Sequence, residues 1–209
     1  MTDLPMNAPI VFIVDDDQDV RNGLSTLLQS IGLKCETFGS APDFLRRKPT
    51  DGESCLILDV RLPGASGLDF QAELARAHID IPIIFITGHG DIPMSVRAMK
   101  AGAVDFLPKP FRDQDLLDSV AAAIERDRKR RARDVDANDL RERFQTLSPR
   151  ERQVMMLVTV GKMNKQVAGD LGLSEITVKI HRAAAMRKMG ARTLAALVLM
   201  AEALKPKAP

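Results

Sequence analysis

Five polar residues in the first half of the sequence stand where apolar runs end, and together they could bind and transfer a phosphoryl group. They are Asp15, Asp16, Asp59, Thr87 and Lys109. Three carboxylates close together need a compensating cation, and oxygen ligands of this kind suit Mg²⁺ or Mn²⁺, which also recruits a phosphate oxygen. Lys109, Thr87 and the metal would hold the oxygens of a phosphoryl group during its transfer to a carboxylate. Asp59 is the predicted nucleophile because it stands alone at the end of a central run.

The elements that must position these residues follow the pattern of βα units. Apolar runs typical of strands cover residues 10–14, 34–38, 55–59, 83–87 and 105–107, and stretches with helical spacing lie between them. This order predicts an α/β fold, a doubly wound (βα)5 domain around a parallel sheet. Ligands of such sheets bind beyond the carboxyl ends of the strands, so we expect the five polar residues to meet in one crevice.

The rest of the chain is predicted to be helical. A helix that begins near residue 113 is expected to continue through residues 126–133, which are too highly charged to be buried, and to link two domains. Ser148 and Glu151 are placed as a capping box, with Pro149 at the first helical position. Further helices are predicted from residue 164, over 175–189 and over 193–203, with a tight turn at 172–174 that is typical of a helix-turn-helix.

The predicted organisation has three parts, and the charge of the chain agrees with it. Residues 1–125 form the phosphoacceptor domain, 126–143 a linker helix, and 144–209 an all-α four-helix DNA-binding domain. Residues 1–125 carry 11 lysines and arginines against 19 acids, whereas residues 126–209 carry 19 against 9, so the net charges are −8 and +10. A basic half suits contact with nucleic-acid phosphates, because neutralising them releases counterions. Charge alone leaves an ordinary solvated surface equally open.

Two further features of the sequence limit the class of protein to which the chain can belong. The apolar run over residues 9–14 meets three aspartates and fits neither a secretory segment nor a membrane span, which predicts a cytoplasmic protein. Cys35 and Cys55 have no metal-ligand spacing and lie in apolar stretches, so both are predicted to be core residues.

The predicted helix over residues 175–189 has one face suited to DNA. Its inward stripe is Val178, Ala185 and Met189, and its opposite face carries Lys179, Ile180, Ala183 and Arg187. Small apolar side chains on an exposed face suit a major groove, where they meet thymine methyl groups, while Lys179 reaches a base or a phosphate. The basic residues expected to contact phosphates are Lys162, Lys165, Arg182, Lys188 and Arg192. His181 is expected either to pack against another helix or to contact a phosphate.

Four segments of the first half resemble the receiver domain of two-component response regulators. They are residues 13–17, 58–64, 86–90 and 106–110. The resemblance implies that Asp59 is the phosphoacceptor, that Asp16 binds the metal directly and Asp15 through water, and that the backbone carbonyl of Arg61 completes the ligand set. It also implies that Thr87 and Phe106 form a switch pair, that Lys109 contacts the phosphoryl group, and that a cis peptide precedes Pro110.

Residues 147–151, 163–168 and 177–182 resemble the LuxR-type helix-turn-helix, in which Thr177 joins the DNA-contacting residues. A receiver followed by this domain is typical of the NarL/FixJ family, and residues 89–93 with the long linker are most similar to FixJ-type and styrene-catabolism regulators. The resemblance implies a transcriptional activator. Its implied partners are a sensor histidine kinase, promoter DNA, RNA polymerase and, on phosphorylation, a second copy of the chain.

Two other functions fit parts of the pattern. A Mg²⁺-dependent phosphatase would also form an aspartyl-phosphate, but it needs an acid two residues after the nucleophile, and Arg61 stands there. We therefore expect no turnover enzyme. A regulator that binds DNA without phosphorylation stays open. Arg61 and His89 flank the pocket and could tune the lifetime of the acyl phosphate, although His89 could equally be a plain loop residue.

Overall fold

The computed structural model of the protein describes residues 8–88 and 92–205. The chain divides into two compact units, the first ending at Arg131 and the second beginning at Ala132. The first unit therefore extends beyond Glu125, the residue after which the sequence pattern placed a boundary, and it includes the first half of a long helix.

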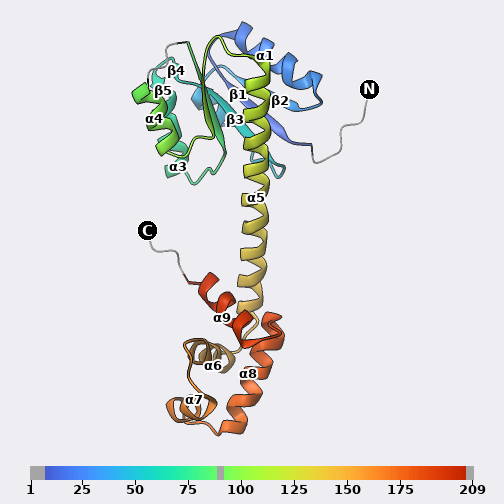
Figure 1. Ribbon diagram of the computed structural model, residues 1–209, viewed down its shortest axis with the longest axis vertical. Coiled ribbons are helices and arrows are strands. Elements are labelled where there is room, and N and C mark those ends of the chain that lie inside the picture. Colours follow the sequence, from blue (N-terminus) through green and yellow to red (C-terminus); the bar gives the residue numbers. More distant parts are fainter. Residues whose placement is uncertain (1–7, 89–91, 206–209) are drawn as a thin grey trace. The chain divides into compact units, whose positions relative to one another are not determined.

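The first unit is built on a five-stranded parallel sheet (Figure 1). Its strands are β1 (Ile10–Val14), β2 (Lys34–Phe38), β3 (Ser54–Asp59), β6 (Ile83–Thr87) and β7 (Asp105–Pro108), in the spatial order β2-β1-β3-β6-β7. All five predicted strands are present. The sequence pattern missed a hairpin of two short strands, β4 (Arg61–Leu62) and β5 (Ala65–Ser66), because two residues are too few to show the alternation of a strand.

Helices cover both faces of this sheet, as a doubly wound fold requires (Figure 1). On one face, α1 (Gln18–Ser30) and the first part of α5 pack on inward residues such as Ile13 and Ile57. On the other face lie α2 (Ala41–Leu45), α3 (Gly67–Arg76) and α4 (Ile92–Lys100), which pack on Phe12, Leu58 and Phe85. Burial on both faces explains why the central strands β1, β3 and β6 are almost wholly apolar, whereas the edge strand β2 is partly exposed and carries polar residues.

Helix α5 (Asp113–Gln145) is one uninterrupted helix of 33 residues. Leu116, Val120 and Ile124 bury its first part against the sheet. The charged run over residues 126–133 was expected to be exposed, and this is wrong for Asp127, which is fully buried. Its contacts with two arginines and a backbone N–H allow this burial.

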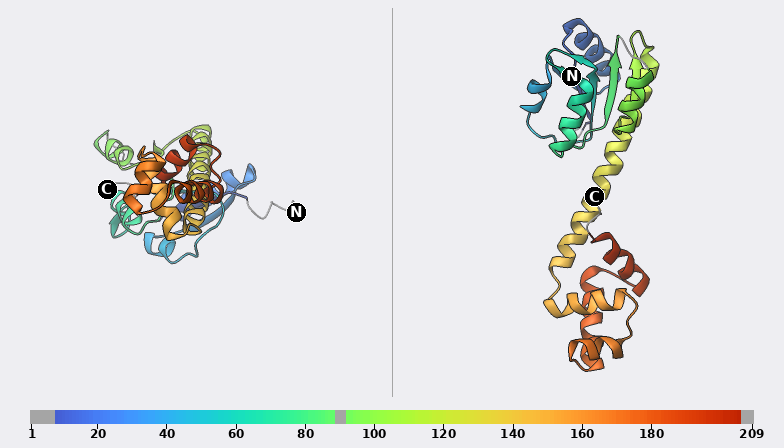
Figure 2. Two further views of the ribbon diagram at one scale, coloured as in Figure 1. Left: turned by 90° about the horizontal axis from the view of Figure 1, so that it is seen from below. Right: turned by 90° about the vertical axis from the view of Figure 1, so that its left-hand side faces the viewer.

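The second unit is all-helical (Figure 2). It contains α6 (Pro149–Thr159), α7 (Asn164–Leu171), α8 (Glu175–Met189) and α9 (Leu194–Ala203), all close to their predicted bounds. The predicted capping box is formed: Glu151 N donates to Ser148 Oγ, and the Glu151 carboxylate accepts from Ser148 N at 2.7 Å. Gly172 ends α7 in the left-handed conformation, with φ 65°, and allows the tight turn into α8.

Both cysteines pack on the same face of the sheet, against α1 and α5. Cys55 is buried and Cys35 is partly buried. Burial raises the pKa of the Cys55 thiol to about 12, and burial also raises the pKa of Cys35. Among residues 8–88 and 92–205, no helix has both the length and the hydropathy needed to cross a membrane.

Candidate phosphoryl-acceptor site and nucleic-acid interface

The three predicted carboxylates meet at the carboxyl ends of two neighbouring strands. Asp15 and Asp16 follow β1, and Asp59 ends β3, which pairs with β1 in parallel. One oxygen from each lies within 4.8 Å of the others. Asp15 and Asp59 are 1% and 6% exposed, whereas Asp16 is exposed. The cluster is therefore open to solvent on the side of Asp16.

Lys109 follows the edge strand β7 and completes the pocket at the carboxyl ends of the strands. Its ammonium bonds to Asp15 Oδ2 at 2.7 Å and lies 3.6 Å from Asp59 Oδ1. Its backbone N–H donates to the carbonyl of Thr87 at 2.7 Å, which joins the ends of β6 and β7. The peptide between Lys109 and Pro110 is cis, as the resemblance implied.

Burial raises the pKa of the Asp59 carboxyl above its usual value. Loss of water contact is the largest cause, and repulsion from Asp15 and Asp16 adds to the rise. Lys109 and the Arg61 backbone N–H, which donates to Asp59 Oδ2 at 3.2 Å, lower this pKa and only partly offset the rise. The pocket thus holds more negative charge than its own cations neutralise.

This donor set fits a hard divalent cation. Three carboxylates offer only oxygen ligands, and the open side at Asp16 leaves room for the waters that Mg²⁺ retains. The backbone carbonyl of Arg61 is the predicted fourth ligand, and Arg61 begins the hairpin strand β4 two residues after Asp59.

The two predicted switch residues lie beside the pocket. Thr87, at the end of β6, is fully buried, and Phe106 in β7 is partly buried. The Phe106 ring packs on Phe85 with the ring centroids 6.3 Å apart. His89, which was predicted to flank the pocket, lies outside the described residues, and Arg61 is exposed at its rim.

Two residues that position this pocket were missed at the sequence level. Arg21, in α1, donates from Nη1 to the backbone carbonyl of Asp15 at 2.6 Å and so holds the loop that carries two of the acids. Gly67 begins α3 directly against β3, and a Cβ there would clash with the Asp59 carbonyl oxygen. Arg21 lies in the first turn of the predicted helix after Asp15, and this short separation is a signal that it can reach the Asp15 loop. No local pattern of the sequence marks Gly67.

Helix α8 presents the predicted DNA face in the second unit. Val178, Ala185 and Met189 are fully buried, as expected. The exposed residues on the opposite side include Lys179, Ile180, Ala183 and Arg187, and Lys165 is exposed on α7. Ile176, 71% exposed, belongs to the same surface and was not predicted. Thr177 is half-buried at the start of the helix, where its N–H donates to the N-cap Ser174.

Three basic residues predicted to contact phosphates are engaged within the second unit. One of them is Lys162, whose ammonium bonds to Asp170 Oδ2 at 2.6 Å. The Lys188 ammonium bonds to Glu151 at 2.7 Å and to the Thr146 carbonyl at 3.1 Å, which ties α8 to α6. Arg182 donates to the Asn164 side chain at 3.2 Å, next to the start of α7. The contacts of Lys188 give it a structural role within the unit, whereas Arg182 lies at the junction of the two helices of the turn.

Comparison with known proteins identifies both units. A model of the response regulator receiver domain matches residues 11–121, and a model of the luxR family of bacterial regulatory proteins matches residues 145–201. This chain belongs to the LuxR-type response regulators. Nodulation protein W of Bradyrhizobium diazoefficiens is 63% identical over 195 residues, which are 93% of this chain and 86% of that protein.

Other relatives of this response regulator agree. The transcriptional regulatory protein FixJ of Rhizobium meliloti is 46% identical over 191 residues, 91% of this chain and 94% of FixJ. The solved structure of the response regulator StyR is 49% identical, with a TM-score of 0.80 over 93% of this chain and 98% of that one. The predicted family, fold class and function as a DNA-binding, two-component transcriptional regulator are thereby confirmed. The receiver implies a histidine kinase partner, and the LuxR-type region implies DNA binding.

Proposed function

We propose that Asp59 accepts a phosphoryl group from a sensor histidine kinase and that this modification controls DNA binding by the second unit. The observation that carries the proposal is the contact of Lys109 with both Asp15 and Asp59 in a cluster of three carboxylates. A carboxylate oxygen of Asp59 forms the new P–O bond while the P–N bond to the kinase histidine breaks, and the imidazole takes the bonding electrons. The Lys109 ammonium stabilises the phosphoryl oxygens.

The metal site of this proposal consists of Asp15, Asp16, Asp59 and the Arg61 carbonyl. Mg²⁺ bound there would supply the positive charge that offsets these carboxylates and the incoming phosphoryl group. Asp59 then stays ionised as the nucleophile, because this positive charge offsets the burial and the repulsion from Asp15 and Asp16 that raise its pKa. We propose no turnover reaction apart from transfer and hydrolysis of the protein's own phosphoryl group.

The switch of this proposal runs through Thr87 and Phe106. The Thr87 hydroxyl moves toward the phosphoryl group, and the ring of Phe106 turns into the vacated space. Phe106 packs in the same core cluster as Met94 and Ala98 of α4. The exposed apolar side chains of α4 are Ile92, Val96 and Met99. Such a row favours contact with a second copy of the chain, so we assign phosphorylation-promoted dimerisation to this face.

The kinase would reach the pocket through a neighbouring groove. A groove of about 400 Å³ lies between α1 and the loop after β7, and it is lined by Val20, Leu24, Leu27 and Phe111, with Lys109 at its edge. Lys109 belongs to both the groove and the pocket, so a kinase helix seated here brings its phosphohistidine close to Asp59. The change of Leu27 to Glu is expected to slow phosphorylation by a kinase and leave phosphorylation by a small phosphodonor unchanged.

The second unit is proposed to place α8 in the major groove of promoter DNA. Lys179, Ile180, Ala183 and Arg187 face the bases, and Lys165, Thr177 and Arg182 hold the backbone. A dimer presents two such helices to a two-fold related site. We further propose that the bound protein contacts RNA polymerase as an activator and that it acts in the cytoplasm, where its promoter lies.

The proposal is tested by incubating the protein with Mg²⁺ and acetyl phosphate and measuring its mass. We expect a gain of one phosphoryl group in the wild type, no gain when a chelator is present from the start, and no gain in Asp59→Asn. The exposed Asp80→Asn serves as the matched control and gains the group normally. No gain in the wild type, or a gain that persists in Asp59→Asn, contradicts the assignment of Asp59.

DNA binding completes the test. Affinity for a promoter fragment at fixed salt is expected to increase on phosphorylation of the wild type and to stay at the unphosphorylated level in Asp59→Asn. An affinity that does not depend on phosphodonor would favour the alternative of a regulator that binds DNA without phosphorylation.

A further inference from the structure

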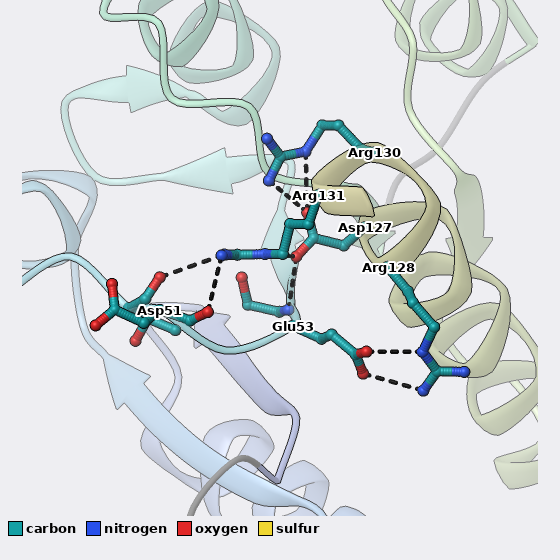
Figure 3. Close-up of polar contacts among 8 residues, drawn as sticks. Asp51, Glu53, Asp127, Arg128, Arg130 and Arg131 are labelled. Carbon is teal, nitrogen blue, oxygen red and sulfur yellow. Dashed lines mark hydrogen bonds and ion pairs between the residues drawn. The ribbon is translucent and has the colours of Figure 1, made fainter. Parts of the chain in front are cut away.

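A cluster of charged side chains fastens α5 to the segment before β3 (Figure 3). This Asp127 clamp consists of Asp127, Arg128, Arg130, Arg131 and Glu53. The buried carboxylate of Asp127 accepts from the backbone N–H of Ser54, the first residue of β3, at 2.9 Å. Arg130 reaches one carboxylate oxygen of Asp127 at 2.7 Å, and Arg131 reaches the other at 2.7 Å.

Two arginines extend the clamp along the same segment. Arg131 also donates to the backbone carbonyl of Asp51 at 3.1 Å and to that of Thr50 at 3.3 Å. Arg128 makes a two-point ion pair with Glu53, at 2.7 and 3.0 Å, and its hydrogen bonds lower the pKa of Glu53. These contacts join residues that are 73 to 81 positions apart in the chain.

Burying a carboxylate is a costly way to hold two elements together. Removing Asp127 from water opposes folding, and apolar side chains of similar size stabilise such a contact at least as well. A carboxylate that must satisfy two guanidinium groups and one N–H accepts only one placement of α5 along the edge of the sheet. The clamp therefore specifies the position and direction of α5 more than it adds to stability.

Directly after the clamp, α5 changes from a buried to an exposed helix. Residues 132–136 are all exposed, and Val135 is 66% exposed. From Leu140 onward, α5 packs into the core of the second unit through Leu140 and Phe144, and Arg143 donates to the Met189 carbonyl at the end of α8 at 3.4 Å. One helix thus has a part held by each unit and an exposed part between them.

We propose that the Asp127 clamp makes α5 up to Arg131 a fixed part of the first unit and confines bending of the helix to residues 132–139. The clamp then couples the linker to the receiver, and it determines which residues of the linker can bend. The position of the joint follows from the contacts alone, whereas its consequence for signalling rests on the proposed function.

Hydrogen exchange of the full-length protein tests the position of the joint. In the wild type, the amides of residues 127–131 are expected to exchange at least about tenfold more slowly than those of 132–139. In Asp127→Asn they are expected to speed up at least about tenfold, because breaking a buried ion pair costs more free energy than a factor of ten represents. The control Asp136→Asn changes an exposed acid of the same helix and leaves residues 127–131 unaffected.

A second variant covers the case in which Asp127→Asn fails to fold. Arg131→Gln removes the bonds to the Thr50 and Asp51 carbonyls and leaves Asp127 paired with Arg130 and Ser54, so a smaller change in the same direction is expected. Unchanged exchange over 127–131 in a folded variant, or wild-type exchange over 127–131 as fast as over 132–139, would overturn the proposal. Slow exchange of the β3 amides confirms that a variant is folded.

The consequence for signalling is measured separately. Asp127→Asn is expected to accept a phosphoryl group from acetyl phosphate at the wild-type rate and to lose most of the phosphorylation-dependent gain in DNA affinity. A full gain in the variant refutes the signalling role of the clamp. A wild type whose DNA affinity does not respond to phosphorylation refutes the proposed function, and hydrogen exchange then still tests the clamp independently.

Discussion

Replacing Asp59 with asparagine is expected to stabilise the metal-free first unit, although it removes the phosphoacceptor. Asp59 repels Asp15 and Asp16, whose oxygens lie within 4.8 Å, and it attracts Lys109 at 3.6 Å. With an effective dielectric constant of about 20, each repulsion amounts to at least about 3.5 kcal/mol and the attraction to about 4.6 kcal/mol. The balance is a net repulsion of about 2 kcal/mol, which the exposure of Asp16 reduces, so we expect a gain of about 1–2 kcal/mol.

The direction of the pH effect follows from the raised pKa of Asp59. A carboxyl whose pKa is higher in the folded state than in the unfolded state destabilises the protein fully above its folded pKa. As the pH falls through that pKa, the wild type takes up a proton and loses the repulsion. The advantage of Asp59→Asn should therefore be largest at neutral pH and should shrink toward acid pH. Added Mg²⁺ should stabilise the wild type and have a smaller effect on the variant.

Native-state hydrogen exchange of the buried β3 and β6 amides measures this stability, because these amides report unfolding of the first unit alone. Asp80→Asn, an exposed change in the same unit, is the control and should change stability little. Equal stability of wild type and Asp59→Asn at neutral pH without metal, or a less stable variant, would refute the reasoning. A stability advantage of Asp59→Asn that grows as the pH falls would also refute it.

Three further predictions concern other residues. Arg21→Gln should raise the Mg²⁺ concentration needed for half-maximal phosphorylation about tenfold, because the loop carrying Asp15 loses its anchor; loss of a positive charge alone would lower that concentration, so the sign separates the two causes. Cys55 should resist a thiol reagent at neutral pH until the protein unfolds, whereas the partly buried Cys35 should react more slowly than a free thiol but before unfolding, because burial raises the pKa of both thiols; release of the coloured leaving group measures this. Lys179→Ala should weaken binding to promoter DNA by about 1–3 kcal/mol if the side chain pairs with a base, and unchanged affinity at fixed salt would remove it from the DNA face.

Much of the fold and of the pocket could be predicted from local patterns. The strand ends at Asp15, Asp59, Thr87 and Lys109 are visible because a buried parallel strand is an apolar run, and a polar residue at its end has one edge of the sheet to occupy. The capping box at Ser148 and the inward stripe of α8 follow in the same way. Such features depend on neighbours within about one or two helical turns.

Tertiary structure alone decided which distant residues hold these elements in place. Composition marked Asp127 as one acid in a solvated run. It is buried because α5 places its carboxylate against the N–H of Ser54, 73 positions earlier, while Arg130 and Arg131 of its own helix pair with it. The sequence predicted that Lys188 contacts a DNA phosphate, and only the packing of α8 on α6 showed that its ammonium also bonds to Glu151. Gly67 needs its lack of a side chain only because α3 begins against Asp59. The periodicity of apolar residues determines which face of a helix or strand is buried. A contact between two elements depends on how they pack in three dimensions, and no short stretch of sequence contains that information.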